Sequence, residues 1–173
     1  MKISNYQNEF KKILEREYFS NQVNPIREIA FEQLKKNGLP SKKWDDLRFT
    51  NFTAFNNNIF RVSEKKDALN KNFDYANMDI DNSYKLIFHN GHFQDNISSL
   101  PDEIDLLSNF EYCNNNNWKI RQPSKSPFDL LNTAFMDSGM SLIIKKNAEI
   151  NLPILLIFVS SGDDSLMISP RLH

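Results

Sequence analysis

Residues 84–93 read Tyr-Lys-Leu-Ile-Phe-His-Asn-Gly-His-Phe and combine a strand pattern with a turn signal. The first five residues are mostly aliphatic and aromatic, which is typical of a β-strand. Asn90 and Gly91 favour a two-residue turn, because both residue types tolerate a positive φ. The sequence therefore predicts a β-hairpin in which His89 and His92 face each other across two strands.

Helices are predicted on the N-terminal side of this hairpin. Residues 1–37 contain two amphipathic patterns, and the second one has clear ends. Asn24 and Pro25 suit a helix start, and Gly38 suits its end. The expected apolar face of this second helix consists of Ile26, Ile29, Ala30 and Leu34.

A third helix is predicted over residues 126–136, opened by Pro127 and ended by Gly139. Strand candidates follow at 141–144 and 153–159. The spacing leaves no room for helical crossovers between strands, which favours stacked or antiparallel β structure. The order of elements predicts an α+β protein.

Two regions are expected in this α+β chain. Residues 1–78 form the helical region with a connector, and residues 79–173 contain the hairpin, the linking helix and the start of a β core. A chain of 173 residues is long enough for one ordinary domain or two small ones.

Composition excludes several classes of protein. With 21 Lys+Arg against 22 Asp+Glu, the chain has no net field that recruits nucleic acid or an acidic membrane. The longest apolar run, Ile154–Val159, is too short to span a bilayer, and the N-terminus lacks a secretory apolar segment. A single cysteine suits a reducing compartment. We therefore expect a cytoplasmic protein with neither a nucleic-acid nor a membrane partner.

Few side chains suggest chemistry. His89 and His92 are weak candidates for a metal site, because metal sites usually need three or four ligands and no third one is close in sequence. Without a metal, both are expected to be partly exposed turn residues. Cys113 has no basic neighbour that would activate it. No catalytic, cofactor-binding or metal residue is assigned, and the residues do not indicate an enzyme.

Four separated segments carry a combined pattern. They are Gly38 to Thr50 (GLPSKKWDDLRFT), the hairpin followed by Ile97-Ser98-Ser99-Leu100-Pro101, Phe128 to Phe135 (FDLLNTAF), and Pro153 with Ser169-Pro170-Arg171. In this order and spacing they resemble the SufB/SufD family of iron–sulfur cluster assembly scaffold proteins, and SufD more than SufB. Leu47 and Phe49 depart from the family pattern, which usually has Trp and Tyr there. The signature residues are Gly38, Pro40, Trp44, Arg48, Phe49, Asn90, Gly91, Leu131, Asn132, Ala134, Gly139, Pro153, Pro170 and Arg171.

The resemblance implies a helical N-terminal region followed by the first turns of a right-handed parallel β-helix. It implies SufB-like and SufC-like partners, with an iron–sulfur cluster in the parent complex and no cofactor in this chain. The chain ends at His173, inside the expected β-helix, so we expect only the N-terminal part of a scaffold. In the connector, Trp44, Leu47 and Phe49 are expected to pin the helices to the β core, with Arg48 anchoring a carboxylate or a backbone carbonyl.

Two other functions remain open. One is a small metal-dependent enzyme or metal-binding domain that uses His89, His92 and an acid such as Asp95. The other is a stand-alone interaction module that uses a phenylalanine-rich helical face.

Overall fold

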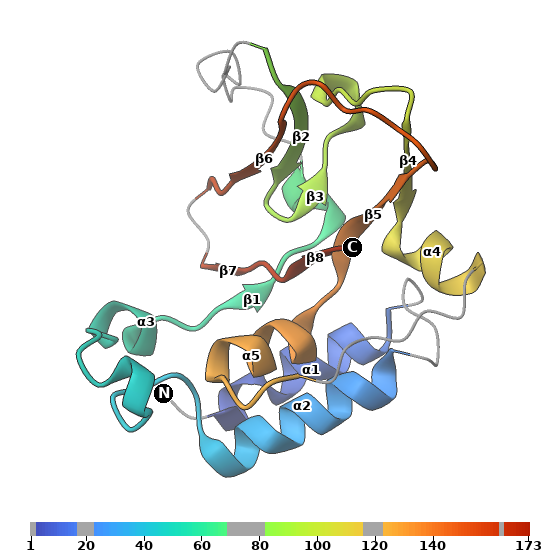
Figure 1. Cartoon of the computed structure of the whole chain (residues 1–173). Coiled ribbons are helices and arrows are strands. Elements are labelled where there is room, and N and C mark those ends of the chain that lie inside the picture. The colour runs from blue at the N-terminus through green and yellow to red at the C-terminus, as the bar shows by residue number, and fades with distance from the viewer. Residues whose placement is uncertain (1–2, 17–22, 69–81, 116–122, 163–164) are drawn as a thin grey trace. The chain divides into compact units, whose positions relative to one another are not determined.

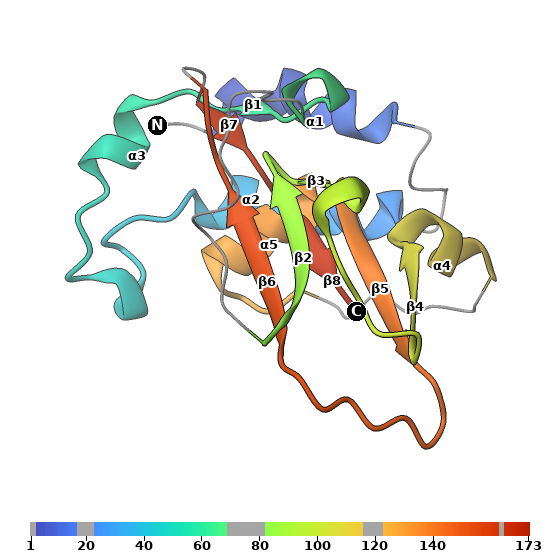
Figure 2. The ribbon, with the colours of Figure 1, turned by 90° about the horizontal axis from the view of Figure 1, so that it is seen from above.

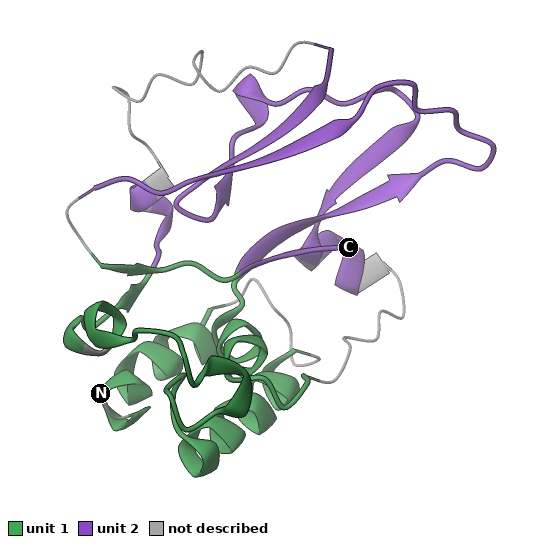
Figure 3. Ribbon diagram, turned by 60° about the vertical axis from the view of Figure 1, so that its left-hand side comes forward, with its two compact units in different colours: residues 1–62, 118–137, 164–169 green, residues 63–117, 138–163, 170–173 purple. Residues whose placement is uncertain are grey.

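The computed structural model describes residues 3–16, 23–68, 82–115, 123–162 and 165–173, and it is a mixed α+β structure (Figure 1). The chain forms two compact units, each built from several separate segments (Figure 3). Unit 1 comprises residues 1–62, 118–137 and 164–169, and unit 2 comprises residues 63–117, 138–163 and 170–173. The region boundary expected at residue 78 falls outside the described residues.

Among the described residues, α1, α2 and α3 precede the first strand, and α4 and α5 lie between β4 and β5. The α-helices are α1 (Gln7–Leu14), α2 (Asn24–Asn37), α3 (Thr53–Asn57), α4 (Asn109–Asn115) and α5 (Pro127–Phe135), with 3-10 turns η1 (Ile3–Tyr6), η2 (Asp45–Leu47), η3 (Lys65–Ala68) and η5 (Asp95–Ile97). The strands are β1 (Arg61–Val62), β2 (Tyr84–His89), β3 (His92–Phe93), β4 (Ile104–Ser108), β5 (Ser138–Ile144), β6 (Ile154–Val159), β7 (Leu166–Met167) and β8 (Pro170–Leu172).

Unit 1 has an aromatic core between α1, α2 and α5. Phe10 of α1 stacks on Phe31 of α2 with ring centroids 3.9 Å apart, and Phe135 of α5 meets both rings edge-on. The three predicted helices are therefore confirmed. Gly38 ends α2 as expected, with a φ of 83° and its N–H bonded to the carbonyl of Leu34.

The buried face of α2 differs from the apolar face expected from sequence. Ile29 is 44% exposed, whereas the charged Arg27 is fully buried. The Arg27 guanidinium donates to the carbonyls of Met136 and Ile13 and to the side-chain oxygen of Asn24. Those two carbonyls lie at the C-terminal ends of α5 and α1, where a helix leaves its last carbonyls unpaired and its dipole favours a cation. Arg27 thus satisfies two helix ends at once.

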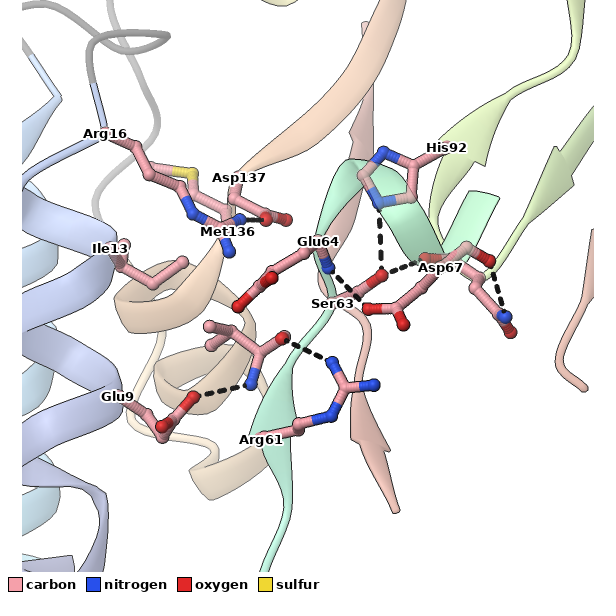
Figure 4. A network of polar contacts seen from close by, with 12 residues as sticks. Glu9, Ile13, Arg16, Arg61, Ser63, Glu64, Asp67, His92, Met136 and Asp137 are labelled. Atoms are coloured by element: carbon pink, nitrogen blue, oxygen red, sulfur yellow. Dashed lines mark hydrogen bonds and ion pairs between the residues drawn. The ribbon is translucent and has the colours of Figure 1, made fainter. Parts of the chain in front are cut away.

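The charge on Arg27 persists despite burial. Desolvation lowers the pKa of Arg27 to about 10, and the nearby carboxylate of Asp137 opposes this shift. Asp137 in turn pairs with Arg16, just after α1 (Figure 4). At neutral pH the guanidinium is therefore cationic and has acceptors on several sides.

Unit 2 contains two three-stranded sheets, with strand orders β3-β2-β6 and β4-β5-β8. Each combines one antiparallel pair with one parallel pair. β6 lies parallel to β2 along its full length, and β8 lies parallel to β5 (Figure 2). Unit 1 holds a third parallel pair, β1 with β7. The described sheets are open.

Gly139 does not end α5, contrary to the sequence-based expectation. The helix ends at Phe135, and Gly139 lies in β5 opposite Arg171 of β8 with a φ of 130°. A Cβ at this position would lie 1.8 Å from the Arg171 carbonyl oxygen. Glycine is needed here because a neighbouring backbone approaches too closely for any side chain.

The connector also differs from expectation. Phe49 is 89% exposed, and the Arg48 guanidinium lies over its ring at 4.7 Å rather than against a carboxylate or carbonyl. Leu39 is buried in the unit 1 core, and the half-buried Trp44 packs against that core. Anchoring therefore comes from Leu39 and Trp44, before the η2 turn redirects the chain and leaves Phe49 in solvent.

Replacing Arg27 by Met should lower the free energy of unfolding by about 2–4 kcal/mol, because the Met136 carbonyl loses its buried donor and the Ile13 carbonyl keeps only the N–H of Arg16. Arg27→Lys should recover only part of this loss, since an ammonium cannot reproduce the planar set of donors. Urea unfolding followed by circular dichroism measures the effect. The exposed Arg48→Met is the control and should change stability by less than about 0.5 kcal/mol. Equal effects at both positions would contradict the role of Arg27.

Gly139→Ala should destabilise the fold by about 3 kcal/mol or more, because the new Cβ meets a backbone carbonyl. Gly162→Ala is a matched control: it also has positive φ, but its Cβ would meet nothing within 4 Å. The control should cost about 1 kcal/mol. Thermal unfolding of both variants tests the difference, and similar losses would argue against the close approach of β8.

Candidate functional site

The hairpin predicted from Asn90 and Gly91 is present. Their φ values are 47° and 86°, so both turn residues adopt the left-handed conformation that a tight hairpin requires. His89 of β2 is paired with His92 of β3 across the turn. The predicted arrangement of the two histidines is therefore confirmed.

His89 is not the partly exposed turn residue that the sequence suggested, since its side chain is fully buried. Its Nε2 lies 2.6 Å from the Ser161 hydroxyl oxygen, in the segment that follows β6. Burial lowers the pKa of His89, so its imidazole is neutral at pH 7. The ring works here as a hydrogen-bonding core residue.

His92 contacts a different serine. Its Nε2 lies 3.1 Å from the Ser63 hydroxyl (Figure 4). That hydroxyl donates its own proton to the Asn90 carbonyl at 2.6 Å. Because the serine proton is already donated, Nε2 of His92 must supply the hydrogen in the other contact. The two histidines therefore diverge onto two serines and do not converge on a common point.

Asn90 is the centre of this polar cluster, and only 4% of its surface is exposed. Its amide nitrogen donates to the carbonyls of Asp67 and Ser161, at 2.9 and 3.0 Å. Its amide oxygen accepts the Ser161 N–H at 3.0 Å. One side chain therefore joins the hairpin turn to two other segments of unit 2. The Asn-Gly pattern predicted the turn but carried no signal for these partners.

The other chemical candidates do not assemble into a site. Among the described residues, no group of three or more His, Cys, Asp or Glu side chains could hold a metal ion. Asp95 is exposed on η5 and gives the two histidines no third ligand. Burial raises the pKa of the Cys113 thiol to about 11, which keeps it protonated and unreactive at neutral pH.

The remaining signature residues lie in α5, in or beside the strands and in the connector. Ala134 is buried in α5, and Asn132 and Leu131 are half-buried on the same helix. Pro153 precedes β6, and its carbonyl accepts the Tyr84 N–H at 2.9 Å, at the start of β2. Pro170 and Arg171 lie on β8, whose backbone pairs with β5. Pro40 is buried in the connector.

Replacing His89 by Gln should lower the free energy of unfolding by about 1–3 kcal/mol at neutral pH, because a buried hydrogen-bond partner of Ser161 is disturbed. The control His92→Gln, at a half-buried ring, should cost less. Unfolding in urea at pH 7.5 compares the two. Equal and negligible losses would contradict the buried placement of His89.

The same substitution should change the pH dependence of stability. Because the folded-state pKa of His89 lies below its unfolded value, the unfolded chain binds the proton more readily. The contribution of His89 is complete above the unfolded pKa of about 6.5 and is lost as the pH falls through the folded value. Between about pH 7 and pH 5, stability should fall more steeply in the wild type than in His89→Gln. Burial also lowers the pKa of His173, which adds its own pH dependence to the stability of the wild type. The stability of the wild type must therefore be compared with that of His89→Gln, which keeps His173, and not with a stability that is independent of pH.

No helix among the described residues is long and apolar enough to cross a membrane. No curated protein gives a significant match to the chain. A family model described as the SufBD protein N-terminal region matches residues 2–156, which is most of the sequence. The match covers α1 to α5, the Asn90 hairpin and the start of β6. The chain therefore belongs to the SufB/SufD family and carries its N-terminal region.

Proposed function

We propose that this chain is a SufD-like scaffold subunit of an iron–sulfur cluster assembly complex. The observation that carries the proposal is the family match over residues 2–156, because that family serves cluster assembly in the SUF system. The SufD-like assignment rests on the combination of the segments around Gly38, Asn90, Asn132 and Pro170. The protein acts in the cytoplasm with SufB-like and SufC-like partners.

We further propose that unit 2 forms the first turns of a right-handed parallel β-helix. Its support is the pairing of strands that lie far apart in sequence: β6 on β2 and β8 on β5, both parallel. A parallel pair needs a long connection, and successive turns of a β-helix supply one. Each later strand lies at the outside of its sheet, so further strands can add in the same direction.

The side chains of the site favour a scaffold over an enzyme. The two imidazoles contact serine hydroxyls, and the buried thiol of Cys113 is protonated at neutral pH. A cluster carried by the complex is cargo of the assembly. The role of this chain is then to hold partners in position through a rigid framework, to which Asn90 and Arg27 contribute the cross-links.

Co-purification tests the scaffold proposal. Tagged chain is co-expressed with a SufB-like and a SufC-like protein, and the recovered complex is analysed for subunit ratio, iron and acid-labile sulfide. We expect a defined complex with the SufB-like protein, and an iron content that is unchanged by His92→Gln. Failure to recover the SufB-like protein would contradict the proposal.

The metal-dependent alternative has its own outcome in the same experiment. If the chain alone retained about one metal ion and lost it in His92→Gln, the protein would be a metal-binding domain. Cys113→Ser serves as the matched control, because it removes a potential ligand whose thiol is buried and protonated at neutral pH.

A further inference from the structure

Unit 2 contains a groove of about 530 Å³ that the polar cluster around Asn90 does not use. Its lining comes from β2, β3, the segment from η5 to β4, and Lys145 after β5. The apolar lining includes Leu86, Phe93, Leu100, Ile104 and Leu106. The acidic lining comprises Asp95, Asp102 and Asp105.

The apolar floor is held in a fixed shape by backbone pairing. The accessible part of this floor comes from the half-buried Phe93, Leu100 and Leu106, whereas Leu86 is fully buried and Ile104 is nearly so. The segment after β3 is tied back to β2, because the Gln94 N–H bonds the Ile87 carbonyl at 2.8 Å and Ser99 pairs with Lys85 in both directions. The groove is therefore built into the fold before any ligand arrives, which reduces the ordering cost of binding.

The acidic side of the groove already binds an ammonium group. Lys145 Nζ lies 3.3 Å from a carboxylate oxygen of Asp105 and donates to the Asp102 carbonyl at 2.6 Å. The carboxylates of Asp95 and Asp102 are exposed, and no cationic side chain among the described residues pairs with either one. Two negative charges beside an apolar floor remain for an incoming cation.

We propose that this groove binds a basic peptide segment of a partner protein. A Lys or Arg of the segment pairs with Asp95 and Asp102, while a neighbouring aliphatic side chain sits on the apolar floor. Nucleic acid is disfavoured because its phosphates meet carboxylates. A small polyamine satisfies the charges but leaves the floor exposed to water, so a peptide with both features fits better.

Fluorescence anisotropy with a labelled Lys-Leu-Lys-Leu-Lys peptide tests the assignment. The double variant Asp95→Asn, Asp102→Asn should weaken binding about three- to tenfold, as expected for two exposed ion pairs. The matched control Asp45→Asn, Asp46→Asn removes two exposed carboxylates from η2 in unit 1 and should leave affinity unchanged. Leu100→Asn should weaken binding without altering its salt dependence, because it removes apolar contact only.

Three results would overturn the proposal. One is an equal loss of affinity in the groove variant and the control variant, which would indicate a general charge effect. Another is equal binding of the Glu-Leu-Glu-Leu-Glu peptide. The third is displacement by spermidine at the concentration at which the lysine peptide itself competes, which would make the groove a polyamine site. Peptide binding and capture of a SufB-like partner are separate measurements, so either can fail alone.

Discussion

The buried guanidinium of Arg27 is the interaction on which unit 1 depends. Two helices of the core, α1 and α5, end in carbonyls that have no partner within their own helix. The Ile13 carbonyl at the end of α1 and the Met136 carbonyl at the end of α5 both accept hydrogen bonds from Arg27 of α2. A single planar cation satisfies them at short range and also complements the negative ends of two helix dipoles. The aromatic cluster of Phe10, Phe31 and Phe135 adds buried apolar surface to this core, but hydrophobic burial is less directional. Arg27 determines where the helices end relative to one another.

In unit 2 a neutral side chain, that of Asn90, links separate segments of the chain by hydrogen bonds. Asn90 joins the hairpin turn to Ser161 and Asp67 through three hydrogen bonds, and it also occupies a left-handed position that few other residues accept. Aspartate could adopt the same backbone conformation but lacks the two N–H donors. The Asn-Gly pair thus encodes a turn and a cross-link at once.

Sequence patterns predicted the elements that depend on local rules. The hairpin follows from Asn90 and Gly91, and the helix ends follow from Pro25, Pro127 and Gly38. These patterns could not predict the burial of Arg27, because apolar periodicity assigns every charged side chain to the solvent-facing side of a helix. Gly139 was misread because a glycine shortly after a helix normally caps it, whereas here a distant strand imposes the glycine. The burial of His89 depends on Ser161, far along the chain, and no local pattern contains that information.

The parallel pairing of β2 with β6 shows why such cross-links matter. β6 reads Ile-Leu-Leu-Ile-Phe-Val, and a strand that is apolar at every position does not specify which side chains face inward. A slip of one residue would keep most of the apolar burial, so burial alone selects the register weakly. Polar groups instead fix the pair at both ends. The Tyr84 N–H donates to the Pro153 carbonyl at one end, and the Asn90 side chain forms hydrogen bonds with the Ser161 backbone at the other. A slip would break both connections and leave buried donors unpaired, which costs more than the apolar contacts can return. Register in this sheet is therefore set by a few hydrogen bonds at the strand ends.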